Sequence, residues 1–180
     1  MIISGSTFHF LSPANQKFLH RHLKLAEAEY RRKTLMLEPL FHLLVACGHI
    51  YMSSRYISLA LRYYLKAFKL KQDDPCLCLS TGIAHLQRGM QARSENRHEH
   101  IMRGFSFIYR YANITGENPE TWYNLARAYH QIGLYNLAIP KYEKCIEARA
   151  SRYKESAYNL GLIYVSIGSN ALAQEVYKMM

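Results

Sequence analysis

The chain has 180 residues, 49% of them apolar and 20% charged, so it is long enough to bury one or two compact cores. Lysine and arginine number 23 against 13 acidic residues, which gives a formal net charge of +10. This charge leaves nucleic acids, membrane surfaces and acidic proteins open as partners. The basic residues are spread along the chain, however, and only Arg31, Arg32 and Lys33 form a run, so no concentrated nucleic-acid-binding stripe is indicated.

The cysteines and the apolar segments exclude further classes of protein. The four cysteines form no Cys-x-x-Cys pair and no zinc-finger cluster with histidine, so no structural metal is expected. The longest apolar stretch, residues 41–52, is too short to span a membrane. Residues 1–20 lack the pattern of a secretory signal, and we expect neither secretion nor a membrane span.

The N-terminal part of the chain shows one candidate helix. Residues 1–12 have no periodicity, and we expect them to be irregular. Residues 13–38 place Phe18, Leu23 and Ala26 among charged residues, which predicts an amphipathic helix that ends before Pro39. This helix is interpreted as a remnant of a preceding repeat.

A repeating unit begins at Phe41. Counting places within each unit, Gly or Ala stands at the eighth and twentieth places, where two antiparallel helices can cross closely, and larger residues stand at the fourth, seventh, eleventh and twenty-fourth places. The small residues are Gly48 and Ala60, Ala126 and Ala138, and Gly161 and Ala173. This spacing resembles the tetratricopeptide repeat, a unit of two packed helices.

The repeat divides the rest of the chain into the units 41–74, 75–118, 119–153 and an incomplete 154–180. The second unit starts in register but needs ten extra residues before Gly104 restores the pattern. We expect the polar segment 90–100 to lengthen the loop or the start of the second helix there. The predicted fold is therefore all-α, a tetratricopeptide-repeat superhelical solenoid of antiparallel helix pairs.

Catalytic and metal-binding patterns are missing from the sequence. No phosphate-binding loop, dinucleotide fingerprint, nucleophile elbow or His-Glu-x-x-His motif occurs. His98 and His100 are two residues apart and would point to different sides of a helix. We therefore predict no enzyme, no catalytic residue, no cofactor and no metal.

Candidate partner-binding residues follow from the repeat geometry. The second, fifth, ninth and twelfth places of each first helix are expected to face a concave channel, whose mixture of apolar, aromatic and basic residues suits a bound peptide. The candidates are His42, Val45, His49, Leu79, Ile83, Tyr123, Arg127, His130, Tyr158 and Leu162. For each of them, solvent exposure or packing between repeats is the competing interpretation. Contacts to phosphates or acidic partners are assigned to Arg31, Arg32, Lys33, Arg93, Arg97 and Arg103.

From Ala60 onward the sequence is more specific than repeats in general. Its marks are Asp74-Pro75, the insertion leading to Arg97-His98, the phrase Gly104-Phe105-Ser106-Phe107, and Tyr123-Asn124-Leu125. These marks closely resemble the C-terminal repeat region of the tetratricopeptide subunit, subunit 3, of general transcription factor IIIC. The resemblance covers about residues 18–174.

The resemblance implies a nuclear, non-enzymatic scaffold for protein–protein interaction in RNA polymerase III transcription initiation at transfer-RNA and related genes. The implied partners are other factor IIIC subunits, with factor IIIB components as further candidates, while DNA is contacted mainly through the complex and no membrane is involved. Two alternatives stay open. One is a free adaptor that binds peptide tails of chaperones or other proteins, and the other is a basic helical segment that binds nucleic acid.

Overall fold

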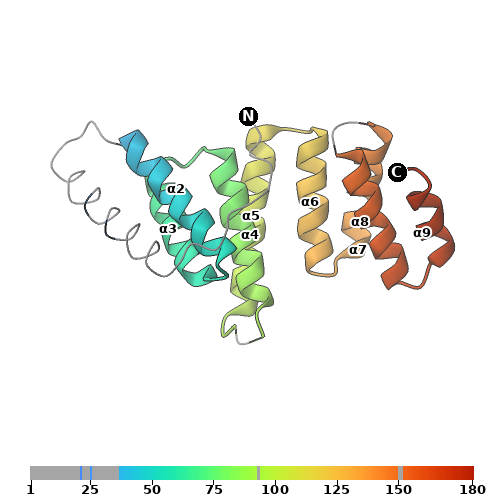
Figure 1. Ribbon diagram of the computed structural model, residues 1–180, viewed down its shortest axis with the longest axis horizontal. Helices are drawn as coiled ribbons and strands as arrows, with labels where there is room; N and C mark the ends of the chain where they lie inside the picture. Colours follow the sequence, from blue (N-terminus) through green and yellow to red (C-terminus); the bar gives the residue numbers. More distant parts are fainter. Residues whose placement is uncertain (1–20, 22–24, 26–36, 93, 150–151) are drawn as a thin grey trace. The chain divides into compact units, whose positions relative to one another are not determined.

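The computed structural model describes residues 21, 25, 37–92, 94–149 and 152–180, and within these ranges all regular structure is helical (Figure 1). The helices are α2 (Leu37–Ser53), α3 (Ile57–Leu70), α4 (Pro75–Met90), α5 (Arg97–Thr115), α6 (Pro119–Gln131), α7 (Tyr135–Glu147), α8 (Tyr153–Ser166) and α9 (Asn170–Tyr177). The predicted all-α class is confirmed.

The repeats are grouped into two larger compact units, Met1–Gly104 and Phe105–Met180, whose boundary lies inside α5. In the first unit α2 packs against α3, and α3 against α4. In the second, α6 packs against α7, α7 against α8, and α8 against α9, while α6 also touches α8. Within each unit, neighbouring helices run in alternating directions (Figure 1).

The first helices of two repeats, α4 and α6, begin with the same kind of N-terminal cap. Asp74 accepts a hydrogen bond from the Leu77 backbone N–H at 2.8 Å, and Asn118 accepts one from the Thr121 N–H at 2.9 Å. Each cap is followed by a proline in the first helical turn, where a backbone N–H has no helical partner to lose. The Asp-Pro and Asn-Pro pairs therefore determine where α4 and α6 start.

Two helix crossings leave no room for a side chain larger than glycine. A methyl group added at Gly48 of α2 would overlap the ring of Tyr64 in α3, and one added at Gly161 of α8 would overlap the ring of Tyr177 in α9. Both glycines stand at the eighth place of their unit, and both tyrosines at the twenty-fourth. The predicted close crossing is present at these positions because the ring of one helix fills the notch in the other.

The extra residues of the second repeat, 75–118, lengthen its second helix as well as the connection between its helices. The helices α4 and α5 have 16 and 19 residues, whereas α6 and α7 have 13 each. The connection between α4 and α5 occupies residues 91–96, and Arg97 already belongs to α5. The segment 90–100 thus contributes to the end of α4, the loop and the start of α5.

The start of α2 differs from the sequence expectation. Leu37 and Glu38, expected to end the preceding helix, instead form the first turn of α2. Pro39 follows them inside the same turn, where its missing N–H costs no helical hydrogen bond. The irregular segment predicted for 1–12 and most of the helix predicted for 13–38 lie outside the described residues, although Arg21 and Leu25 are helical.

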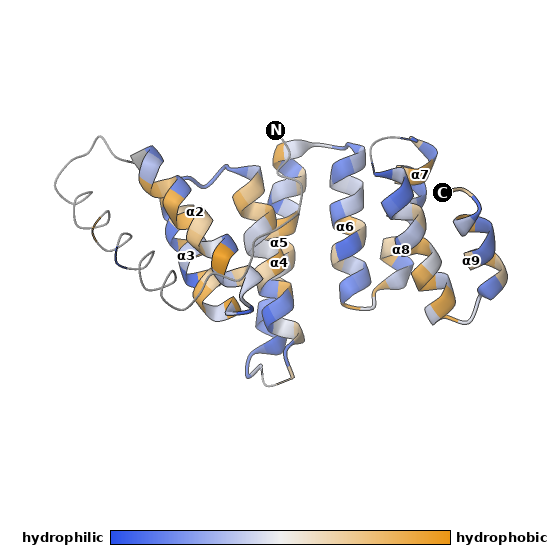
Figure 2. Ribbon diagram, viewed as in Figure 1, coloured by the Kyte–Doolittle hydropathy of each residue, from blue (hydrophilic) through white to orange (hydrophobic). Residues whose placement is uncertain are grey.

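Hydrophobic residues are unevenly distributed among the helices. Figure 2 shows many of them along α2 and fewer along α6, most of whose residues are coloured hydrophilic or intermediate. The core of the first unit contains Leu44, Cys47, Tyr64 and Ala67, all nearly inaccessible to solvent. In the part of the chain that the structure describes, no helix is both long enough and apolar enough to cross a membrane.

Candidate protein-interaction surface

A pocket of about 420 Å³ opens between α6 and α8 in the second unit. It is lined by Tyr123 and Arg127 of α6, by Lys154, Glu155, Tyr158 and Asn159 of α8, and by Met180. The structure thus brings together three of the predicted channel residues. Tyr123 and Arg127 lie one turn apart on α6, and Tyr158 lies opposite them on α8.

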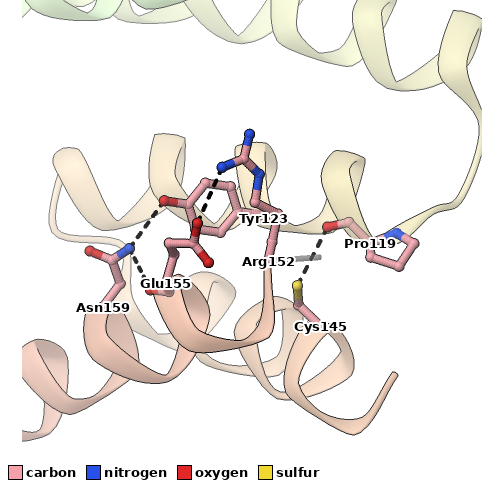
Figure 3. Close-up of polar contacts among 6 residues, drawn as sticks. All are labelled: Pro119, Tyr123, Cys145, Arg152, Glu155 and Asn159. Carbon is pink, nitrogen blue, oxygen red and sulfur yellow. Dashed lines mark hydrogen bonds and ion pairs between the residues drawn. The ribbon is translucent and has the colours of Figure 1, made fainter. Parts of the chain in front are cut away.

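Tyr123 is at the centre of this pocket wall. The guanidinium groups of Arg127 and Arg152 each lie 5.7 Å from the centroid of its ring, close enough for cation–π attraction. The Asn159 amide nitrogen lies 3.5 Å from the Tyr123 hydroxyl and donates a 2.8 Å hydrogen bond to the backbone carbonyl of Glu155. Figure 3 shows Arg152, Glu155 and Asn159 gathered around this tyrosine.

The pocket walls are connected by contacts between helices. Cys145 of α7 directs its thiol toward the Pro119 carbonyl at 3.5 Å, which joins α7 to the first turn of α6 (Figure 3). Burial raises the pKa of the Cys145 thiol, so the group stays protonated and acts as a donor. Because Asn118 caps the same turn, the start of α6 is held from two sides.

The electrostatics of the pocket favour an anion. Glu155 is the only acidic side chain among the residues that line the pocket, and it forms an ion pair with Arg152 at 3.3 Å. Arg127 and Lys154 have exposed side chains. Among the described residues, neither of these two cations has a carboxylate within ion-pair distance. A carboxylate entering the pocket would therefore meet two uncompensated cations.

An apolar row continues from the pocket along α8. Tyr158, Leu162 and Val165 are 51%, 39% and 50% exposed, although apolar side chains of this size are usually buried. Their spacing of four and three residues places them on one face of the helix. Leu162 is one of the predicted channel residues, and Val165 stands at the twelfth place of the same unit.

Periodicity alone does not select Arg152, Lys154 or Met180 for this surface. Arg152 and Lys154 stand at or just before the start of α8, outside the four places expected to face the channel. Met180 is distant along the chain, and no repeat spacing relates it to α6. One sequence feature points to Lys154: it is adjacent to Glu155, which stands at the second place of its repeat and is therefore expected to face the channel.

Two predicted channel histidines turn toward the second helix of their own unit. The His49 Nδ1 atom lies 2.8 Å from the Tyr64 hydroxyl, and desolvation of the ring lowers the pKa of His49. The His130 Nδ1 atom lies 3.5 Å from the Tyr142 hydroxyl, and the pKa of His130 is lowered by burial and by Arg127. Both tyrosines stand at the twenty-fourth place, so these contacts join the two helices of one repeat.

The remaining channel candidates are in the first compact unit. His42 is exposed and lies 3.6 Å from Glu38, an i,i+4 neighbour. Val45 packs against the hydrophobic core, and Leu79 and Ile83 are half-buried. None of these four belongs to the pocket described above.

The basic candidates divide into two groups. Arg31, Arg32, Lys33 and Arg93 lie outside the described residues. Arg97 and Arg103 are exposed on α5, and Arg103 forms an ion pair with Glu99 at 2.7 Å. The carboxylate of Glu99 offsets part of the positive charge that a phosphate would need there.

Two histidines form a contact between α4 and α5. The Nδ1 atoms of His85 and His100 are 3.0 Å apart, and His85 is only 2% exposed. Burial lowers the pKa of His85 to about 4, with further contributions from His100 and Arg103. Desolvation also lowers the pKa of His100, so the neutral form is favoured for both rings at pH 7. Within the described residues, no group of three or more His, Cys, Asp or Glu side chains could hold a metal ion.

The fold identifies the class of protein as a tetratricopeptide-repeat solenoid. The family model of the tetratricopeptide repeat matches residues 41–74 and 119–152. A crystal structure of MamA aligns with a TM-score of 0.64 over 95% of this chain and 94% of its own, at 16% identity. At that identity the likeness supports the fold alone.

Three relatives are named as subunits or polypeptides of transcription factors. The chain is 35% identical over 93% of its length to transcription factor tau subunit sfc4 of Schizosaccharomyces pombe. It is 35% identical over 73% to general transcription factor 3C polypeptide 3 of Homo sapiens, and 36% identical over 69% to the transcription factor tau 131 kDa subunit of Saccharomyces cerevisiae. It spans 20%, 16% and 13% of these relatives. The resemblance to the tetratricopeptide subunit of factor IIIC is confirmed.

Proposed function

We propose that the chain is a non-enzymatic scaffold for protein–protein interaction, acting as part of transcription factor IIIC in RNA polymerase III transcription initiation at transfer-RNA and related genes. The similarity over 93% of the chain to a tau subunit carries this proposal. The α6–α8 surface supports it, because cations and apolar side chains are exposed next to one another on a rigid helical base.

The scaffold works in the nucleus, where its partners are other subunits of factor IIIC. The first helix of each repeat supplies the contacts, and in the second compact unit Tyr123, Arg127 and Tyr158 line one pocket of this surface. Components of factor IIIB are further candidate partners. DNA is held mainly through the assembled complex, and no membrane takes part.

Affinity purification tests this proposal. The tagged full chain is recovered from nuclease-treated nuclear extract of the source organism, and co-purifying proteins are identified by mass spectrometry. We expect other factor IIIC subunits, in amounts reduced by the double change Tyr123→Ala with Arg127→Glu. Recovery of none of these subunits by the unaltered chain would refute the proposal, and equal recovery by the double variant would refute the assignment of the surface.

A free adaptor that binds peptide tails is the second candidate, and the cationic pocket favours it. Such an adaptor would bind short peptides without the rest of factor IIIC. Recovery of chaperones, with no factor IIIC subunit, in the same purification would support the adaptor. Binding to DNA that weakens steeply as salt is raised would instead support the third candidate, a nucleic-acid-binding segment.

A further inference from the structure

The pocket between α6 and α8 and the apolar row on α8 form one continuous surface. Tyr158 belongs to both, since it lines the pocket and begins the exposed row that continues through Leu162 to Val165. The row extends about 10 Å along the helix axis at 1.5 Å per residue. Residues 158–165 contain no charged side chain, so the surface changes from cationic to apolar along its length.

The polar end can bind a carboxylate in more than one way. Arg127 and Lys154 supply positive charge, and the one acidic side chain of the pocket, Glu155, is already paired with Arg152. The Tyr123 hydroxyl lies 3.5 Å from the Asn159 amide nitrogen, which can only donate. The hydroxyl proton is therefore directed elsewhere and can be given to an incoming oxygen.

We propose that this surface binds an acidic, amphipathic segment of a partner protein. An Asp or Glu side chain of that segment enters the pocket beside Arg127 and Lys154, and its apolar residues cover Leu162 and Val165. The inference rests on the proposed scaffold function and adds the chemistry of the partner. A nucleic acid matches the surface less well, because its phosphates would use the cations but leave the apolar row in water.

Four pools of synthetic peptides test the proposed chemistry. The pools are acidic with apolar residues, basic with apolar residues, neutral with apolar residues, and acidic with polar residues only. A length of about twelve residues spans the surface in a helical or an extended conformation. We expect the labelled full chain to bind the acidic apolar pool best. Equal or better binding of any other pool would overturn the proposal.

Variants then locate the binding site. For the best acidic apolar peptide, Arg127→Glu with Lys154→Glu should weaken binding by about tenfold or more, and Leu162→Ala with Val165→Ala by several-fold. The matched control reverses two exposed charges of α3 by Arg62→Glu with Lys69→Glu, and it should bind as the unaltered chain does. Because all these side chains are at least partly exposed, circular dichroism should report the same helix content throughout.

The result separates this inference from the proposed function. If factor IIIC subunits still co-purify with the Arg127→Glu, Lys154→Glu chain and peptide affinity is unchanged, the scaffold function stands and the pocket assignment is wrong. If the acidic apolar peptide binds and the charge reversals abolish binding, but no factor IIIC subunit is recovered, the pocket assignment stands and the scaffold function is wrong.

Discussion

Arg55 occupies a backbone conformation that two other repeats give to glycine. Its φ angle is 62°, while Gly133 and Gly168 have φ angles of 79° and 80°. All three stand at the fifteenth place of their unit, in the turn between the two helices. A left-handed conformation costs a residue with a side chain roughly 1–2 kcal/mol, whereas glycine adopts it freely.

Replacing this arginine should stabilise the chain. Since the Arg55 side chain is exposed, we expect Arg55→Gly to raise the free energy of unfolding by about 0.5–1 kcal/mol, after the greater entropy of an unfolded glycine is subtracted. Gly133→Ala is the converse change, and it should lower stability although the added methyl meets nothing within 4 Å. Urea denaturation measures both, and destabilisation by Arg55→Gly would contradict the argument.

His85 makes stability depend on pH. Burial lowers its pKa to about 4 in the folded chain from the ordinary 6.5 of an unfolded one, so acid adds a proton to the unfolded state first. The free energy of unfolding should be constant above about pH 6.5 as far as His85 is concerned, and it should fall by about 2 kcal/mol as the pH decreases to about 4.5. His85→Gln should flatten this dependence in urea denaturation, whereas His98→Gln, at an exposed position, should preserve it. An unchanged slope in His85→Gln would show that other groups cause the effect.

At the scale of one element, α7 contains an internal weakness. Pro140 is the sixth residue of the helix, and it has no N–H to donate to the Asn136 carbonyl four residues earlier. The proline ring is exposed and contributes little to packing. We expect Pro140→Ala to raise the thermal midpoint and to stabilise the chain by about 1–2 kcal/mol. A lower midpoint would mean that the proline ring stabilises the helix. Asn136→Ala, which retains the proline, serves as the control.

At the scale of the whole molecule, stability should be local. Repeat proteins bury surface mainly between sequence neighbours, so a lesion is expected to act chiefly on its own unit. Gly48→Ala and Gly161→Ala each force a methyl group against a tyrosine ring, at a cost of about 1–3 kcal/mol. Hydrogen exchange should show lost protection mainly in α2 and α3 for the first change, and mainly in α8 and α9 for the second. Equal losses in both units would demonstrate one cooperative core.

Most of the fold could be predicted because repeat packing is local. Gly48 and Tyr64 are sixteen residues apart, and their contact follows from one helix, one turn and a second helix of standard length. The units predicted to begin at Pro75 and Pro119 likewise begin where α4 and α6 start, because a cap residue followed by proline is a short-range helix-start signal. The first turn of α2 could not be predicted as well, since Pro39 is tolerated both after a helix and inside a first turn.

The sequence by itself determined the helix pairs and the small residues at their crossings, and it predicted which places of each first helix face a channel. Only the tertiary structure decided that His49 and His130 bond to tyrosines of their own units, and that Lys154 and Met180 join Tyr123 in one pocket. The physical reason is the range of the interactions. Repeat spacing specifies neighbours within a unit, whereas the groups that face one another across α6 and α8 depend on how successive pairs stack and how each side chain turns.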